Sequence, residues 1–209
     1  LTGRSLSRWL THKNEPFKIF DSDRALSIKN PHNGRIEELH VTTGWSVENW
    51  KEALLEQNVL QMSSNESAKR ISSLLRARLE PLGSDLWQIV RDGEKEQATQ
   101  AALSGAIKNS RLLGDFMDST LRDQRALFAK KLEYPMWSDY IASCRGRDPD
   151  MPSWSETTLA KLRSAVFSIL AEAGYIKDTR SLLLQNVFVD AHVADCLRSR
   201  GETYVLRCL

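Results

Sequence analysis

The side chains best placed to do chemistry in this sequence are cations on one predicted helix. An S-x-x-E capping box at residues 63–66 begins the helix, and apolar residues recur at helical intervals until a proline and a glycine stop it. At about 100° per residue, Lys69 and Arg76 project together opposite the apolar arc, with Arg70 on its rim. No acid lies within residues 67–79 to offset them. The pattern fits contact with a polyanion, and a solvated helix face is supported about equally well.

Arg78 belongs to the same segment but has a different expected role. It falls between Leu74 and Ile71 on the helical wheel, at the edge of the apolar arc. An unpaired charge would be costly there, so we expect its guanidinium to meet a carboxylate or to reach the boundary. The sequence therefore assigns Arg78 to structure and leaves the other three cations for a partner.

A second basic face is expected if the segment 110–132 forms one helix. Arg111, Arg122 and Arg125 then share an arc of roughly 60°. We take these three arginines as further candidate nucleic-acid contacts. The opposite side, expected to face the core, carries Leu113, Phe116, Met117, Leu127 and Phe128.

Acidic residues weaken the case for this second face. Asp115 and Asp118 lie on the same arc, and Asp118 is four residues before Arg122, the spacing of a helical ion pair. A solvated surface laced with such pairs is therefore the favoured interpretation of this face.

Catalytic patterns are weak in this chain. It contains no phosphate-binding glycine loop, no H-E-x-x-H zinc motif and no G-x-S-x-G nucleophile motif. His192 and Cys196 could share a helix face as base and nucleophile, but a half-buried thiol beside a histidine explains them better. Pairs such as Asp115 and Asp118 lack an obvious third ligand. We predict no enzymatic activity, no cofactor, no metal and no small-molecule substrate.

Composition places the chain among ordinary globular proteins. Its 209 residues are 41% hydrophobic and 27% charged, with a formal charge of +2. This charge is too small to argue for nucleic acid by itself, so the argument rests on local clusters. The three cysteines match no disulfide framework or zinc spacing, and no apolar run approaches the roughly 20 residues that span a bilayer. We expect a cytoplasmic monomer without membrane contact.

The elements that position these side chains are mostly helices. Periodicity and caps predict them at 46–57, 63–80, 84–92, 94–109, 110–132, 137–144, 155–173 and 190–200. Residues 174–189 look extended, and residues 1–45 fit short strands or loops. The best internal break is the loop 145–154, which separates a region 1–144 from a C-terminal helical subdomain 155–209, unless the two form one continuous domain.

The sequence resembles the BrxA family of bacterial BREX phage-defence systems over residues 45–209. Three stretches carry the likeness in order: NVLQMSSNESAKRISSLLRARLEPL, ALSGAIKNSRLLGDFM, and Trp154 with TLAKLRSAVFSILAEAGYI. The resemblance implies a compact, mostly α, NusB-like helical bundle without catalytic activity, and a DNA-binding role in the defence complex. The family's motif around the capped helix corresponds to Asn58, Leu60, Arg70, Arg78 and Leu79.

Residue chemistry and resemblance together favour an accessory subunit that binds double-stranded DNA beside other BREX subunits. The candidate contacts are Lys69, Arg70, Arg76, Arg111, Arg122 and Arg125. Two alternatives remain open: a protein-interaction scaffold within the defence complex, and an RNA-binding protein of the NusB-like kind.

Overall fold

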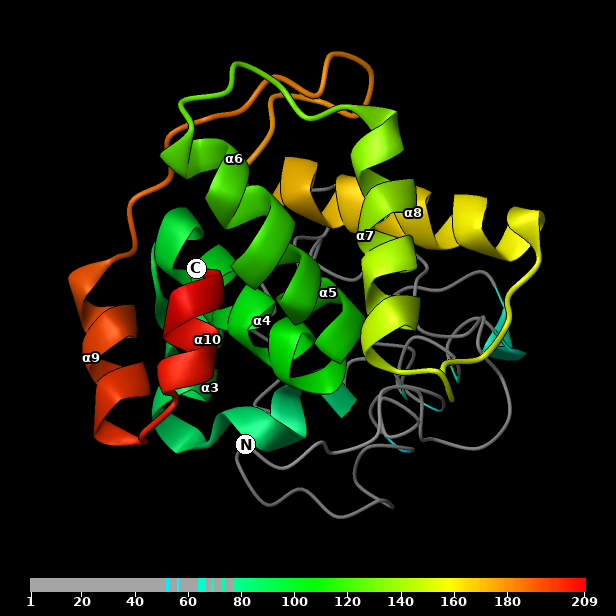
Figure 1. Cartoon of the computed structure of the whole chain (residues 1–209). Coiled ribbons are helices and arrows are strands. Elements are labelled where there is room, and N and C mark those ends of the chain that lie inside the picture. Colours follow the sequence, from blue (N-terminus) through cyan, green and yellow to red (C-terminus); the bar gives the residue numbers. More distant parts are fainter. Residues whose placement is uncertain (1–51, 53–55, 57–63, 67–68, 70–72, 74–76) are drawn as a thin grey trace.

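The computed structural model describes residues 52, 56, 64–66, 69, 73 and 77–209 (Figure 1). The expectations for residues 1–45, for the helix at 46–57 as a whole, and for Arg70 and Arg76 lie outside these described residues.

Helices dominate the described chain, which confirms the prediction of a mostly α protein. In order they are the 3-10 turn η3 (Glu80–Leu82), α3 (Ser84–Asp92), α4 (Lys95–Asn109), α5 (Arg111–Phe116), the π-helix η4 (Met117–Leu121), α6 (Arg122–Ala126), α7 (Tyr134–Arg147), α8 (Glu156–Glu172), α9 (Ala191–Ser199) and α10 (Thr203–Cys208). No helix among the described residues combines the length and apolar character needed to cross a membrane.

Local caps explain why several helices begin where the sequence places them. The Ser155 hydroxyl accepts from the Thr158 N–H at 3.3 Å, as expected for the start of α8. At the start of α4, the Glu94 N–H donates to the Gln97 side chain at 3.2 Å, which completes a capping box. Asp190 caps α9.

The central helix is α4, whose residues 101–107 are all buried. It contacts α3, η3, α5, α9 and α10, so it organises the part of the molecule that carries the candidate site. Gly105 permits one of these approaches, because a Cβ there would lie 2.3 Å from the Arg78 carbonyl oxygen. Glycine weakens an isolated helix, but the close approach of the Arg78 backbone requires it at position 105.

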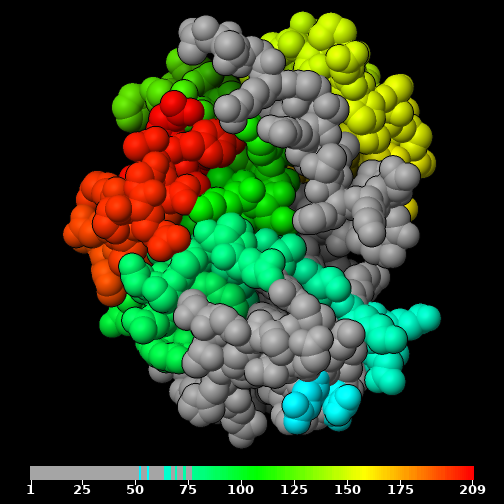
Figure 2. Space-filling view, turned by 90° about the horizontal axis from the view of Figure 1, so that it is seen from below, coloured from blue at the N-terminus to red at the C-terminus, as the bar shows by residue number. Residues whose placement is uncertain are grey.

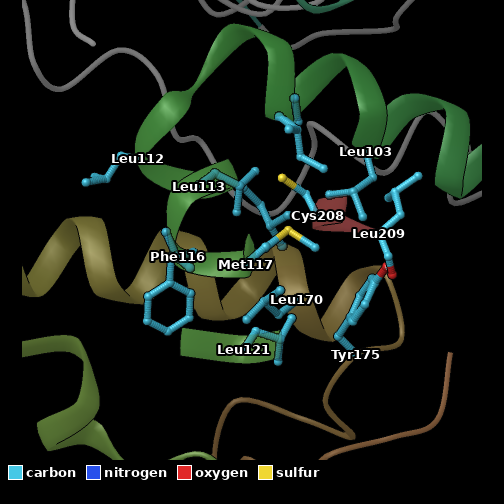
Figure 3. Packing of buried hydrophobic residues seen from close by; sticks show 14 of the residues in the cluster. Leu103, Leu112, Leu113, Phe116, Met117, Leu121, Leu170, Tyr175, Cys208 and Leu209 are labelled. Atoms are coloured by element: carbon cyan, nitrogen blue, oxygen red, sulfur yellow. The ribbon is translucent and has the colours of Figure 1, made fainter. Parts of the chain in front are cut away.

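The core joins residues from both sides of the predicted internal break (Figure 3). Phe116 lies 5.5 Å from Trp137, 5.2 Å from Tyr140 and 6.1 Å from Phe167 between ring centroids. These four aromatics are buried, and Phe116 was predicted to face the core. One hydrophobic cluster includes residues of α8, α9 and α10 together with those of the earlier helices. The division into two regions at 145–154 stays a prediction.

The prediction of one helix over 110–132 is wrong. A π-helical turn interrupts it at 117–121, and the helix ends at Ala126. The wider turn shifts every later residue on the helical wheel. Leu127 and Phe128, predicted to face the core, follow the end of the helix and are 73% and 91% exposed.

Three further differences concern element ends. α7 is longer than the short helix predicted at 137–144, so the following loop starts at Asp148. The region 174–189, predicted to be extended, contributes to two isolated antiparallel bridges. Leu183 pairs with Lys131 outside the region, and Ile176 pairs with Leu184. After α9 the chain forms α10, which the sequence did not predict, and the Tyr175 hydroxyl donates to the Leu209 carbonyl at 2.6 Å.

Candidate nucleic-acid interface

Of the three cations predicted on the 63–80 helix, the structure describes Lys69. It is helical and exposed, and its carbonyl accepts from the Ser73 hydroxyl at 3.0 Å. Arg70 and Arg76 lie outside the described residues. The proposed role of this face therefore stays a prediction.

Arg78 has the structural position that the sequence assigns to it. Its side chain is buried, with 4% of the residue exposed. Burial lowers the pKa of Arg78 to about 10, and the negative charge of Glu172 opposes that shift. Glu172 is at the end of α8, so the expected carboxylate comes from a distant helix.

Two of the predicted arginines join a surface that includes the end of the chain. Asp118 on η4 accepts from Arg122 at 2.6 Å and from Arg207 on α10 at 2.8 Å. The Asp118 side chain is 15% exposed, whereas Arg122 and Arg207 are 53% and 59% exposed. One nearly buried carboxylate thus positions two guanidinium groups whose remaining N–H donors face solvent.

Tyr204 links these groups to Arg111. The guanidinium carbons of Arg111 and Arg207 each lie 5.8 Å from the centroid of the Tyr204 ring, within the range of cation–π attraction. Burial raises the pKa of Tyr204 above its usual range, so its hydroxyl stays protonated. The aromatic ring therefore attracts both arginines without adding negative charge.

A fourth arginine comes from α7. Arg147 donates to Asp115 at 2.8 Å and to the Cys144 sulfur at 3.3 Å. The hydrogen bond to Asp115 raises the pKa of Arg147, whose side chain is 52% exposed against 19% for Asp115. The negative charge of Asp115 also contributes, after burial, to the raised pKa of Tyr204.

We call this group the arginine surface: Arg111, Arg122, Arg147 and Arg207 around Asp115, Asp118 and Tyr204. Figure 2 shows α10 at the molecular surface beside α9. The side chains of Asp115 and Asp118 are mostly buried, whereas those of Arg122, Arg147 and Arg207 are more than half exposed. Planar donors fixed in this way match the oxygens of a phosphate group.

Arg125 is directed elsewhere, although the sequence groups it with Arg111 and Arg122. It donates to the Val187 carbonyl at 2.9 Å, and its guanidinium lies 5.6 Å from the Tyr175 ring centroid. These long-range contacts explain the separation. Its predicted part in nucleic-acid binding stays a prediction.

Sequence reasoning missed Arg147 and Arg207. Both lie in the last turn of a helix, where basic residues are favoured by the helix dipole, but that signal is weak. Arg207 was also hidden because α10 was not predicted. The expected ion pair between Asp118 and Arg122 is present at 2.6 Å.

The remaining chemical candidates show no activated group. The Asp190 carboxylate accepts from the backbone N–H of His192 at 2.9 Å, a bond that caps α9. Burial raises the pKa of the Cys196 thiol, opposite to the shift that activates a nucleophile. Within the described part of the chain, no three His, Cys, Asp or Glu side chains gather in an arrangement that could hold a metal ion.

Comparison with known proteins gives consistent results. The BrxA family model matches residues 36–201. A BREX protein BrxA from Paramagnetospirillum magneticum (strain ATCC 700264 / AMB-1) is 44% identical over 88% of this chain and 92% of the relative, and one from Escherichia coli O9:H4 (strain HS) is 28% identical over 77% and 75%. The crystal structure of an uncharacterized protein from Magnetospirillum magneticum is similar with a TM-score of 0.72 at 45% identity, over 79% of this chain and 84% of that chain.

Proposed function

Because this chain belongs to the BrxA family of BREX phage-defence systems, we propose that it is a non-catalytic accessory subunit that binds duplex DNA through the arginine surface. The observation that carries the proposal is the shared carboxylate of Asp118, which holds Arg122 and Arg207 side by side while leaving both more than half exposed. Arg111 and Arg147 extend the same surface through Tyr204 and Asp115.

Backbone phosphates are the ligand that this surface fits. Arginine presents a planar fork of donors to phosphate oxygens, and the underlying carboxylates limit the rotamers available before binding. The surface brings together four arginines and two aspartates.

The proposal predicts a marked salt dependence. If all four arginines neutralise phosphates, log K should fall with log salt concentration at a slope of about −3.6, from roughly −0.9 per phosphate. Affinity for duplex DNA alone should be weak, on the order of 1–100 µM at physiological salt. Other subunits of the system would then supply target choice.

The decisive experiment replaces Arg111, Arg122 and Arg207 by alanine together with Asp118→Asn, so that no carboxylate is left without its partners. We expect duplex-DNA affinity to fall and the salt slope to become less negative by about 3, by loss of roughly one phosphate contact per arginine. Fluorescence anisotropy across a salt series measures both. A matched control is Arg198→Ala with Asp195→Asn, which removes an exposed pair of 2.5 Å from α9. If the salt slope is the same in the Arg111, Arg122, Arg207 and Asp118 variant as in the parent, the arginine surface does not contact DNA.

The 63–80 helix is tested separately. Lys69→Glu, Arg70→Glu and Arg76→Glu in one chain should weaken DNA binding if this predicted face also contacts phosphates. Unchanged affinity with an unaltered circular dichroism spectrum removes that face from the proposal. Competition among duplex DNA, single-stranded DNA and RNA identifies the preferred ligand. If RNA binds most tightly, the protein is an RNA-binding protein of the NusB-like kind and the proposal of duplex-DNA binding is wrong.

A further inference from the structure

A second surface feature stands apart from the arginine surface. Among the described residues, the most exposed large apolar side chains are Phe128 at 91%, Phe188 at 85% and Leu127 at 73%, and Leu183 is 38% exposed. We call these four residues the phenylalanine patch. Isolated exposed apolar residues are common on proteins, whereas a group of them marks an interaction site.

Hydrogen bonds bring the two segments of the patch together in antiparallel order. The Leu132 N–H donates to the Leu182 carbonyl at 2.9 Å, and the Leu184 N–H donates to the Lys130 carbonyl at 3.0 Å. Further along, the Arg125 guanidinium bonds the Val187 carbonyl at 2.9 Å. Figure 1 shows the two loops, green after α6 and orange after α8, running together. Residues 127–132 and 182–188 therefore present their exposed side chains from one paired structure.

The backbone at Phe128 is unusual. The Ala129 N–H donates to the Gln124 carbonyl at 2.9 Å, and the Phe128 N–H donates to the Arg125 carbonyl at 3.0 Å. This pair of bonds is the Schellman motif that ends many helices. It requires a left-handed backbone at its central position, and Phe128 accordingly has φ of +54°.

Two other helices end with the same motif but with different residues. α8 and α9 have glycine at the equivalent position, Gly174 with φ of +80° and Gly201 with φ of +69°. Glycine is the residue that this conformation favours, because a Cβ is strained there. Phe128 thus combines a disfavoured backbone with an aromatic ring left in water, and neither feature stabilises the isolated chain.

The charges beside the patch are mainly basic. Lys130, Lys177 and Arg180 are exposed on the same loops. Lys131 lies 3.4 Å from Glu133, an exposed pair that contributes no net charge. The backbone N–H and the hydroxyl of Ser181 donate to Asp178 and lower its pKa, so this carboxylate is engaged within its own turn.

From this juxtaposition we propose that the phenylalanine patch is the docking site for another protein subunit of the BREX system, through a segment that presents apolar side chains between carboxylates. Phe128 and Phe188 insert among the apolar side chains, and Lys130, Lys177 and Arg180 meet the acids. Charge complementarity selects such a segment, because a basic rim disfavours a basic partner. The aliphatic Leu127 and Leu183 favour a protein over stacked bases, which use aromatic faces. This site is separate from DNA binding.

The test uses the full chain with an affinity tag, co-expressed with the other subunits of its BREX system and captured after nuclease treatment. The variant is Phe128→Gly with Phe188→Ser. Glycine suits the Schellman position, so this variant should fold at least as well as the parent. We expect capture of one subunit by the parent chain, and an affinity for that purified subunit that is lower by roughly 30-fold or more in the variant, as for hot-spot residues.

Two more variants sharpen the assignment. Phe188→Leu keeps an apolar side chain and should retain most of the capture. Lys130→Glu with Arg180→Glu should weaken capture and make the remaining binding less dependent on salt. Duplex-DNA affinity should stay unchanged in all three variants, which separates this proposal from that of the arginine surface.

Four results would overturn the proposal. They are no subunit captured by the parent chain, equal capture by the Phe128→Gly, Phe188→Ser variant, a parent dimer that this variant dissociates, and a loss confined to single-stranded nucleic acid. The third would assign the patch to a second copy of the chain, and the fourth to base stacking.

Discussion

The arginine surface and the phenylalanine patch differ in how their side chains are held before any partner binds. On the arginine surface, Asp118 and Asp115 accept from three arginines and Tyr204 lies between two of them. At the patch, Phe128 is 91% exposed on a left-handed backbone. The first surface is stabilised within the chain, whereas the second is not.

This difference separates two ways in which a surface can be prepared for a partner. Charged groups keep favourable contacts with water and with each other before binding, so a charged site need not cost stability. Exposed aromatic rings give up the free energy of burial until a partner covers them. Substitutions should therefore have opposite effects on stability at the two sites, and four variants test this contrast.

The largest effect is expected for Gly114→Ala beneath the arginine surface. A Cβ at this position would lie 2.6 Å from the Tyr204 hydroxyl and 3.0 Å from Ile107. Tyr204 must then move from between Arg111 and Arg207, so we expect a loss of about 1–3 kcal/mol in the free energy of unfolding. Urea denaturation measures it. The control is Gly146→Ala in α7, where a Cβ meets nothing within 4 Å and should raise stability by up to about 1 kcal/mol.

The next effect isolates the cost of a side chain at a Schellman position. Gly174→Ala places a Cβ on a backbone with φ of +80° and with nothing within 4 Å, so strain acts without crowding. We expect a loss of about 1–2 kcal/mol, measured by thermal and urea unfolding. Gly201→Ala, at φ of +69°, should behave alike. Equal stability of these variants and the parent would show that the conformation carries no penalty here, and would remove the strain argument at Phe128.

Phe128→Gly should have the opposite sign. The substitution relieves the left-handed strain and removes a ring that is 91% exposed, while glycine adds entropy to the unfolded chain. The net gain should be about 0.5–1 kcal/mol in the free energy of unfolding. Phe188→Gly serves as control, because Phe188 has no positive φ to relieve. A destabilised Phe128→Gly variant would mean that the ring contributes to the fold, contrary to the contrast drawn above.

The smallest effect is expected for Asp118→Asn. The amide keeps one oxygen as an acceptor for one of the two arginines, places an NH2 donor against the other, and removes one negative charge beneath them. Stability should fall by about 1 kcal/mol or less, because both arginine side chains are more than half exposed and can turn to solvent. Duplex-DNA affinity should rise by a few-fold at low salt and converge with the parent at high salt. A large loss of affinity would instead show that the carboxylate is essential for orienting the two arginines.

Short-range features were predictable to a large extent. The caps and periodicity of α3, α4 and α8 place these helices within a residue or two of their bounds, and the buried aromatics follow from the same periodicity. The Asp118 to Arg122 pair is a contact over one helical turn, and it too was expected.

Predictability fails where a single residue changes the register. The π-helical turn at 117–121 and the end of the helix at Ala126 leave no clear mark in the sequence, and Leu127 and Phe128 after that end lie in solvent. Apolar periodicity alone would have buried both residues. The Schellman motif at Phe128 was equally hidden, because the expected glycine signal is absent from that position.

The sequence by itself determined the helical class of the protein, the bounds of α3, α4, α8 and α9, the structural role of Arg78 and the family, because these depend on patterns spaced a few residues apart or on long stretches of identity. Tertiary structure alone decided which side chains gather on the two proposed surfaces. Arg207 reaches Asp118 across 89 residues, Arg147 reaches Asp115 across 32, and Arg125 reaches Val187 across 62. Such contacts are set by how α4, α5, α7 and α10 pack around one core, and local propensity contains no information about that packing.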